Sequence, residues 1–459
     1  MSQQRLGFSK LDGEPVHSGS SPNRRIPPEV LSEIFSLCLP TNGLPRPNPF
    51  EAPLLLCQIC SSFRTVALSS PKLWASISII RNRARDEDAL MLDMWIERSG
   101  PYTLSFALTY RESGGNIDKL IKQLAPHSSR WKDVTVRFAG DRVPLYFLEA
   151  MSRGTSALEK LNIQSFGTVP LFPNGTVPRY SNGRMLNVSL AHNLKEITID
   201  FQNNLQLDFG TAVLDKVKKV SFIGHCYVWI HAQLIFDCLE HCPAIEKFAS
   251  EGSAIDGNHP ENVKPLTLPS LEDFIMNATF GNPYPIFDLL HLPSLVTFTL
   301  ICNTVPENLN SIVNLLKRSG GHIENLTITG NDTYVLANHI IDCLEQAPRL
   351  KHLACNFGMG LVAQVLRTNR VCAELASITL SADENTDLSL MGEMIFSRWF
   401  IPQSNEGSDI GLGGGRRLER VTICGGIPRK DLVEIPAIAL CVAEGFELRC
   451  DRGRSSIFG

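Results

Sequence analysis

The residues best suited to chemistry are cysteines, and Cys57 and Cys60 have the Cys-x-x-Cys spacing of metal and redox sites. A structural zinc site would need a second pair of ligands at a matching spacing, and no such pair is present. Both residues lie within an apolar stretch with helical periodicity. We therefore interpret them as buried structural thiols.

A denser group of thiols and imidazoles follows at His225, Cys226, Cys238, His241 and Cys242. Its spacing matches no common four-ligand zinc site. Cys238 and Cys242 are four residues apart and would share one face of a helix. Packing explains this group better than metal binding, so no metal site is predicted.

Motifs for catalysis are also lacking. The glycine-rich run at 411–415 is followed by Arg416 and Arg417, where a phosphate-binding loop would have Lys and then Ser or Thr. No Ser-His-Asp arrangement, carboxylate pair or His-Glu-x-x-His motif stands out. The sequence predicts neither an enzyme nor a bound cofactor, so the function must lie in binding.

The first cysteines belong to a segment, residues 25–80, that is predicted to form three short helices. Pro27 and Pro28 suit a helix start, because proline has no N–H to lose there and its φ is already helical. Apolar residues then recur with helical spacing until Pro40. A second helix is expected over Ala52–Leu68.

The third helix of this segment is expected to start at Ser69 or Ser70 and to place Leu73, Trp74 and Ile77 on one face. So short a segment cannot bury a core alone at this apolar load. Its first residues therefore leave surplus apolar surface, which is typical of a docking module.

Three motifs in this segment resemble the F-box, and most closely the F-box-like proteins expanded in mushroom-forming fungi: I-P-P-E-V-L-x-E-I-F, L-L-L-C-x-x-C-x-x-F-R-x-x-A and P-x-L-W. Phe63 stands where many relatives carry Trp. The resemblance implies a non-catalytic substrate receptor of an SCF-type ubiquitin ligase, joined to a cullin through the adaptor Skp1. The residues expected to contact Skp1 are Ile26, Pro27, Pro28, Glu29, Val30, Leu31 and Ile34.

A repeat dominates the remainder of the chain. The pattern apolar-x-x-apolar-x-apolar recurs from LEKLNI at residue 158 to LERVTI at 418, with WKDVTV at 131 as an opening unit. Most units are 23 to 28 residues apart, which is typical of leucine-rich repeats. Each unit supplies a short parallel strand and a return segment, often helical, and stacking them makes one core.

The predicted fold class is α/β, with a three-helix F-box module followed by an irregular leucine-rich-repeat solenoid. Residues 1–24 are expected to be disordered, 25–80 to form the module and 81–459 the solenoid. Two longer spacings predict loop insertions near 164–191 and 402–416. Ala89–Ser99 is expected to be an amphipathic helix with Leu90, Met94 and Trp95 inward.

Outward positions of the repeat strands are candidates for substrate binding. Lys195, Lys218, Lys219 and Lys247 could form a basic strip for an acidic or phosphorylated protein. Glutamates lie among them, so a mixed, solvated face is the favoured interpretation. Later outward positions are neutral and rich in hydroxyls: Thr297, Thr299, Asn325, Thr327, His352, Ser377 and Thr379.

Composition sets the remaining bounds. A formal net charge of −4 and a pI near 6.3 argue against nucleic-acid binding. No secretory signal or membrane helix is predicted. The 13 cysteines are then read as reduced thiols, which favours a cytoplasmic or nuclear protein.

Two other functions stay open. The repeats could form a protein-interaction scaffold that never joins a ligase. Alternatively, the repeats could belong to a parallel β-helix enzyme, which would be favoured by acidic residues clustered on consecutive strands. No such clustering is seen.

Overall fold

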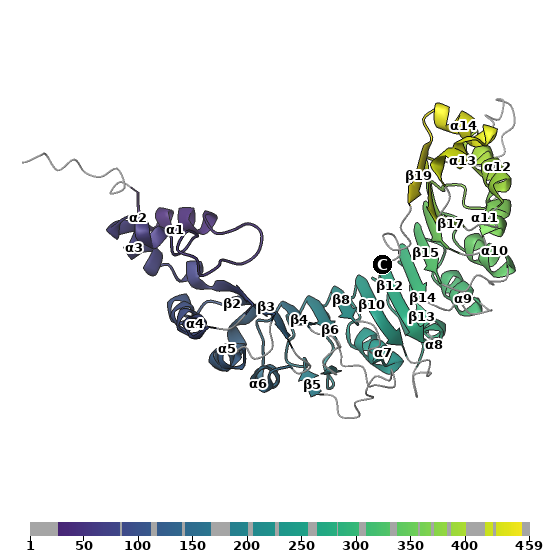
Figure 1. Ribbon diagram of the computed structural model, residues 1–459. Coiled ribbons are helices and arrows are strands. Elements are labelled where there is room, and N and C mark those ends of the chain that lie inside the picture. Colours follow the sequence, from purple (N-terminus) through teal and green to yellow (C-terminus); the bar gives the residue numbers. More distant parts are fainter. Residues whose placement is uncertain are drawn as a thin grey trace, which may run out of the picture.

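The computed structural model describes most of the chain. The described residues form an open arc (Figure 1). The described residues are 26–82, 85–111, 117–139, 143–166, 184–200, 205–224, 229–255, 264–281, 283–302, 309–330, 337–356, 359–368, 371–382, 387–400, 418–425 and 428–451. The predicted N-terminal segment 1–24, most of the first insertion and the insertion at 402–416 lie outside these ranges.

One parallel sheet of 15 strands runs along the arc, and its strands follow the order of the chain. The path consists of β1 (Ser76–Arg81), β2 (Leu104–Tyr110), β3 (Trp131–Ala139), β4 (Lys160–Phe166), β6 (Glu196–Asp200), β8 (Lys219–Ile223), β10 (Lys247–Ile255), β12 (Asp273–Gly281), β14 (Thr297–Cys302), β15 (Asn325–Thr329), β16 (His352–Cys355), β17 (Ser377–Ala382), β18 (Arg420–Gly425) and β19 (Glu447–Asp451). The short β9 (Trp229–Ile230) pairs with β10. Every predicted repeat unit from residue 131 to 423 contains one of these strands, so the repeat prediction is confirmed as a parallel α/β array.

Helices return the chain along the outer, convex side of the arc, which leaves the sheet on the concave side (Figure 1). They are α4 (Asp86–Ser99), α5 (Ile117–Leu124), η3 (Ala125–Arg130), α6 (Leu145–Arg153), α7 (Ala232–His241), α8 (Tyr284–Asp288), α9 (Asn310–Arg318), α10 (Ala337–Glu345), α11 (Met359–Leu366), α12 (Leu388–Trp399), α13 (Arg429–Val433) and α14 (Pro436–Ala443). In α5 the buried residues are Ile117, Leu120, Ile121 and Leu124, the spacing of one helix face.

The repeats between β4 and β8 use strands for their return segments. β5 (Arg184–Asn187) pairs in parallel with β7 (Leu205–Asp208) in a separate two-stranded sheet. A second small sheet joins β11 (Leu266–Thr267) to β13 (Leu290–His291). The end of the predicted insertion at 164–191 is therefore an ordered part of a repeat, and the prediction of a loop there was wrong.

Side chains alternate along each strand, so one set fills the space between sheet and helices. Phe248, Phe274 and Phe298 are buried on adjacent strands, and successive ring centroids lie 5.4 and 6.1 Å apart. One hydrophobic cluster extends from Leu31 to Leu448. The stacked repeats thus share a continuous core, as their periodicity predicts.

Four short helical segments precede the sheet: α1 (Pro28–Leu37), α2 (Leu56–Ile59), α3 (Ser61–Leu68) and the 3-10 turn η2 (Pro71–Trp74). The predicted second helix is broken, because Cys60 has extended backbone angles of φ −159° and ψ 169°. The predicted third helix ends at Trp74, and Ile77 lies in β1. The residues of β1 alternate between the two faces of the sheet, and β1 pairs with β2 at the sheet edge.

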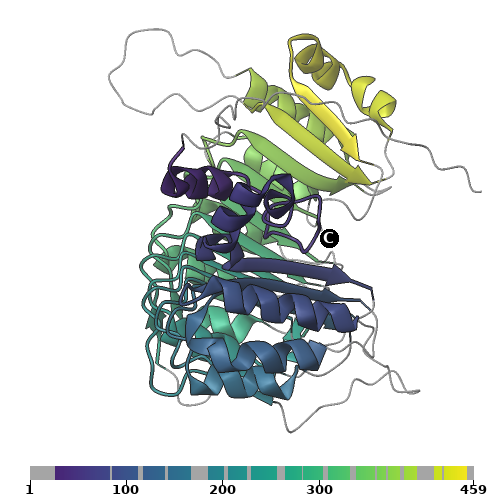
Figure 2. The ribbon, with the colours of Figure 1, turned by 90° about the vertical axis from the view of Figure 1, so that its left-hand side faces the viewer.

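These segments cover the end of the arc next to β1 (Figures 1 and 2). They have no separate core, since Leu31, Phe35 and Trp74 belong to the same cluster as the repeats. Helix α4 follows as predicted, with Trp95 buried, but Leu90 is 70% exposed and its inward placement was wrong. Within the described residues, no helix is long and apolar enough to cross a membrane.

Candidate binding surfaces

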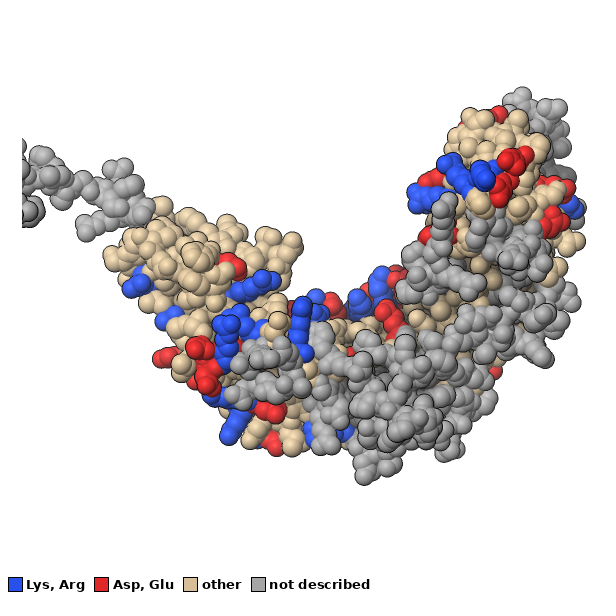
Figure 3. Space-filling model, viewed as in Figure 1, with Lys and Arg blue, Asp and Glu red and all other residues tan. Residues whose placement is uncertain are grey.

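An apolar stripe lies on the exposed side of α1. Val30, Ile34 and Leu37, hereafter the terminal stripe, are 48%, 42% and 84% exposed. Their spacing of four and three residues places them on one helix face. The end of the molecule that carries α1 to α3 shows few charged side chains (Figure 3). Such a face is unusual for a surface helix, which makes it a candidate binding surface.

The other residues predicted at this edge divide into two groups. Ile26, Pro27, Pro28 and Glu29 are exposed beside the terminal stripe. Leu31 is only 4% exposed and packs in the core, so its predicted role as a contact was wrong. Leu31 lies one residue from Val30 along α1 and therefore on a different face.

Further exposed apolar side chains belong to the same end of the chain, at Phe50, Leu55 and Ile59. Sequence reasoning missed these and Leu37. Leu37 could have been found by its position seven residues after Val30, which is two helical turns. Ile59 could not, because its exposure depends on the break at Cys60.

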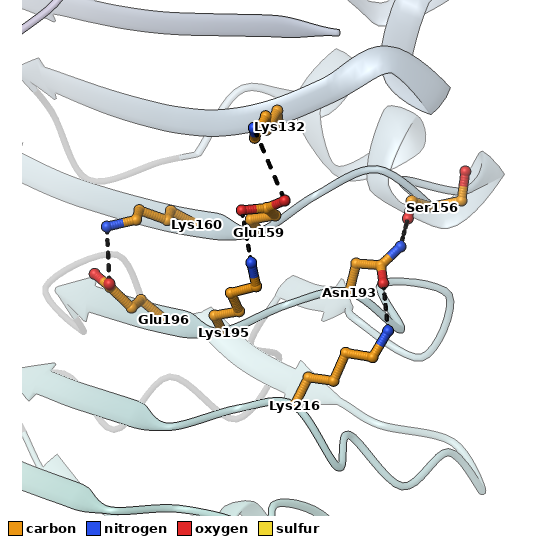
Figure 4. A network of polar contacts seen from close by, with 8 residues as sticks. All are labelled: Lys132, Ser156, Glu159, Lys160, Asn193, Lys195, Glu196 and Lys216. Atoms are coloured by element: carbon orange, nitrogen blue, oxygen red, sulfur yellow. Dashed lines mark hydrogen bonds and ion pairs between the residues drawn. The ribbon is translucent and has the colours of Figure 1, made fainter.

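Charged side chains dominate the concave face over the first repeats, where they pair between neighbouring strands. Glu159 accepts from Lys195 at 2.9 Å and lies 3.9 Å from Lys132, while Lys160 lies 2.8 Å from Glu196 (Figure 4). The hydrogen bond from Lys195 lowers the pKa of Glu159. The hydrogen bond to Glu196 raises the pKa of Lys160.

The same pairing continues over the next strands. Lys218 binds Glu246, and Lys247 donates to Asp273 at 2.5 Å, which raises the pKa of Lys247. Lys219 has no carboxylate partner among the described residues. Three of the four lysines considered for substrate binding are thus paired with carboxylates, and the face has the mixed character that the sequence favoured.

A second polar ladder runs along the edge where the chain enters the strands. The Asn193 side chain donates to the Ser156 carbonyl at 2.7 Å and accepts from Lys216 at 2.6 Å (Figure 4). These three residues come from consecutive repeats. The contacts therefore connect successive turns of the arc rather than forming a pocket.

Neutral polar side chains become frequent further along the concave face, where Lys351 and Glu324 still form an ion pair at 2.6 Å. This hydroxyl belt consists of Thr297, Thr299, Asn325, Thr327, His352, Ser377 and Thr379, on β14 to β17. Thr297, Asn325, His352 and Ser377 are register partners across the four strands. Thr299, Thr327 and Thr379 lie two residues further along their strands and so face the same side.

Hydrogen bonds within the hydroxyl belt leave much of its capacity free. Asn325 Nδ2 donates to Thr297 Oγ1 at 3.2 Å, and His352 Nδ1 lies 2.6 Å from Ser377 Oγ. Among the described residues, the hydroxyls of Thr299, Thr327 and Thr379 have no partner. The belt can therefore donate and accept several hydrogen bonds without a change in charge.

The belt ends where charge returns on the last strands. Arg420 and Arg449 both contact Glu447, each at 2.5 Å. The hydrogen bonds from these arginines lower the pKa of Glu447. Paired charges therefore occur on the first and last strands of the concave face, and one further pair, Lys351 with Glu324 at 2.6 Å, lies beside the hydroxyl belt.

The cysteines considered for chemistry have structural surroundings. Cys60 is the N-cap of α3, and its sulfur accepts from the Phe63 amide at 3.4 Å. Burial raises the pKa of Cys57, but Cys57 and Cys60 are only partly buried, so the prediction that both are buried was wrong. Cys238 in α7 and Cys242 at its C-cap are fully buried. Within the described ranges, no group of three potential metal ligands occurs.

Several candidate residues cannot be placed. His225, Cys226 and the glycine-rich run with Arg416 and Arg417 lie outside the described residues.

No protein-family model matches this chain, and a search of curated proteins found no match. The binding surfaces are therefore interpreted from their own chemistry and from the sequence motifs.

Proposed function

We propose that this protein is a non-catalytic substrate receptor of an SCF-type ubiquitin ligase. Its F-box-like N-terminal segment would bind Skp1, and through it a cullin, while the leucine-rich-repeat-like arc holds a protein substrate. Ubiquitin would be transferred by the partner subunits. The F-box-like motifs are the origin of this proposal.

The terminal stripe is the observation that carries the proposal furthest. Burying apolar surface contributes about 25 cal/mol per Å² removed from water, so exposed Val, Ile and Leu on one helix face favour association. The stripe also coincides with the segment that resembles the F-box. A contact there would leave the concave face of the repeats free for a second protein.

The shared core connects the proposed adaptor-binding segment directly to the proposed substrate-binding repeats. Trp74 and the repeats belong to one hydrophobic cluster, so the terminal helices are packed directly on the first repeat. A rigid connection fixes the distance between a bound adaptor and a bound substrate. Holding two reactants together raises their effective concentration, which is how a non-catalytic subunit accelerates transfer.

Binding to purified Skp1 tests the proposal. Titration calorimetry should detect binding by the wild-type chain and a loss of affinity by Val30→Asp with Ile34→Asp. Interface anchors typically cost about 1–2 kcal/mol or more each on truncation, so at least a tenfold weakening is expected. Both residues are exposed, so the melting temperature should change little.

Leu90→Asp is the matched control, because Leu90 is an exposed apolar residue on α4, outside the terminal segments. It should bind Skp1 like the wild type. Equal binding by the stripe variant would refute the position of the contact. If the wild-type chain does not bind Skp1, the ligase role is wrong and a repeat scaffold becomes the better account.

A further inference from the structure

We infer that the free edge of β19, the last strand of the sheet, is a docking site for an extended segment of a partner protein. The segment would add one more strand to the sheet. It would place an acidic side chain on the concave side, between two apolar side chains that face the helices. This inference goes beyond the proposed function and does not depend on Skp1, because β19 lies at the end of the arc opposite the terminal stripe (Figure 1).

The two ends of the sheet differ in how their edges are covered. At the first end, α1 to α3 lie over the arc beside β1, and the Ser78 amide donates to the Pro45 carbonyl at 2.7 Å. At the last end, β19 pairs with β18 alone among the described residues. An unpaired strand edge presents a row of N–H and C=O groups that can bind another strand. Within the described part of the chain, the last end is therefore the one open to an added strand.

The direction of the β19 backbone identifies the groups that are available. The Glu447 amide donates to the Glu419 carbonyl at 3.1 Å and so points toward β18. Because successive amides of a strand point to opposite sides, those of Leu448 and Cys450 point to the free edge. Neither has a backbone hydrogen bond on that side within the described residues. These amides and their carbonyls are the groups that strand addition uses.

The helix layer beside this edge lacks a polar end. All residues of α14, PAIALCVA, are uncharged, and Leu440 is 51% exposed. The last repeat of an array ordinarily has a polar outer face, because that face meets water. Cys450, on the helix side of β19, is only partly buried. Apolar side chains of an added strand would therefore meet apolar neighbours on this side.

The charges on the concave side specify an acidic side chain. Arg420 and Arg449 share the carboxylate of Glu447, and neither contacts another carboxylate within the described ranges. This cluster therefore has one more cation than anion. Arg449 lies on the edge strand, and its side chain is 58% exposed. An acidic residue facing Arg449 from the added strand would complete the pairing, since opposite charges on neighbouring strands stabilise a sheet.

A second copy of β19 is a poorer occupant. Antiparallel pairing of the whole strand with its copy would centre on Arg449 and place Arg449 opposite itself. It would also place Glu447 opposite Asp451 of the second copy. Like charges directly opposite each other destabilise a sheet, and charged residues on an edge hinder pairing between copies. The pattern therefore favours a strand from a different protein.

Selection from a random displayed-peptide library on the immobilised full-length chain supplies the probes. Enriched peptides should share an acidic residue between two apolar β-formers. Their affinities, measured by fluorescence anisotropy, should fall about fivefold or more in Arg449→Glu, because attraction is replaced by repulsion. A peptide with lysine in place of its acidic residue should bind Arg449→Glu better than it binds the wild type.

Backbone pairing is tested separately from charge. N-methylation of alternate peptide amides keeps the side chains but removes donors, and should weaken binding about tenfold or more. Cys450→Pro removes an edge N–H that β18 does not use, so binding should weaken while the melting temperature changes little. Hydrogen exchange, resolved to single residues by mass spectrometry, should be fast at Leu448 and Cys450 in the free chain and slower with bound peptide.

Arg420→Glu is the matched control, because Arg420 contacts the same Glu447 but lies on β18, one strand further from the edge. An added strand would be about 10 Å away, where salt screens exposed charges, so affinity should stay within about twofold. Melting curves of each variant would show that the fold is kept.

Slow exchange at Leu448 and Cys450 in the free chain would mean that the edge is already covered, and would overturn the inference. A library without enriched sequences would also contradict it, as would peptides that bind Arg449→Glu and Cys450→Pro as tightly as the wild type. The chain is used without Skp1, so the result is independent of adaptor binding. Peptide binding without Skp1 binding would keep the edge site and reject the ligase role.

Discussion

The indole rings of Trp74 and Trp95 meet edge to face, with centroids 4.8 Å apart and planes at 74°. Trp74 belongs to η2 and Trp95 to α4, so this contact joins the terminal helices to the first repeat. Trp74 Nε1 donates to the Ala67 carbonyl at 2.9 Å, and the Arg98 guanidinium lies 4.5 Å from its ring centroid. One side chain therefore ties three elements together.

Trp74→Ala should destabilise this end of the arc by about 3–5 kcal/mol, because it empties a fully buried site and leaves the Ala67 carbonyl without its donor. Hydrogen exchange measured by mass spectrometry should be faster in α1 to α3 of the Trp74 variant than in the wild type. In the last repeats, exchange should change less. Phe50→Ala, at a site 82% exposed, should change stability by less than about 0.5 kcal/mol. Equal protection in the wild type and the Trp74 variant would contradict the linking role.

The strand β15 offers a test of the alternation within one repeat. Leu326→Asp and Ile328→Asp each place a carboxylate in the core. Each should lower the free energy of unfolding by about 3 kcal/mol or more. Thr327→Asp, on the outward side between them, should cost under about 1 kcal/mol. Urea unfolding followed by circular dichroism would measure all three. Similar losses would mean that the strand is not half exposed.

Arg398 is buried on α12 and has no carboxylate partner among the described residues, and burial lowers its pKa. Its guanidinium donates to the carbonyls of Leu366, Val371 and Cys372 at 2.5 to 2.7 Å. Arg398→Met leaves three buried carbonyls without this donor, so we expect a loss of about 3 kcal/mol or more in unfolding free energy.

Arg367→Met is the control for the Arg398 variant. Arg367 forms a surface ion pair with Glu393 at 2.6 Å, and both side chains are about half exposed. Surface pairs contribute about 0–1 kcal/mol, so this variant should melt close to the wild type. If the two variants melt alike, the carbonyl contacts of Arg398 are not holding the repeats together.

Glu159 should make stability depend on pH in a defined direction. Lys195 lowers its pKa below the ordinary value of 4.5, so its contribution is present above that value and is lost as pH falls through the lowered pKa. The site is solvated, so Glu159→Gln should cost under about 1 kcal/mol at neutral pH. The difference between variant and wild type should vanish in acid, as measured by urea unfolding at several pH values. If the difference in unfolding free energy grew in acid, the pairing of Lys195 with Glu159 would not be stabilising in the way proposed.

Local periodicity determined most of the repeat architecture. The six-residue pattern alternates between faces with a period of two, so Leu326 and Ile328 are inward and Thr327 outward whatever the neighbouring strand is. The start of α1 at Pro28 was also readable, because proline favours the first helical position. Such features depend on residues close together in the chain.

Only the tertiary structure decided the features that depend on distant residues. Ile77 has the spacing of a helix, yet it pairs with Phe106 of β2, because a sheet edge was available. Lys247 was identified as basic, but its pairing with Asp273 follows from the register of β10 and β12, which places the two residues opposite each other. The half-exposed hydroxyl belt likewise depends on the register of β14 to β17, which brings together residues separated by whole repeats.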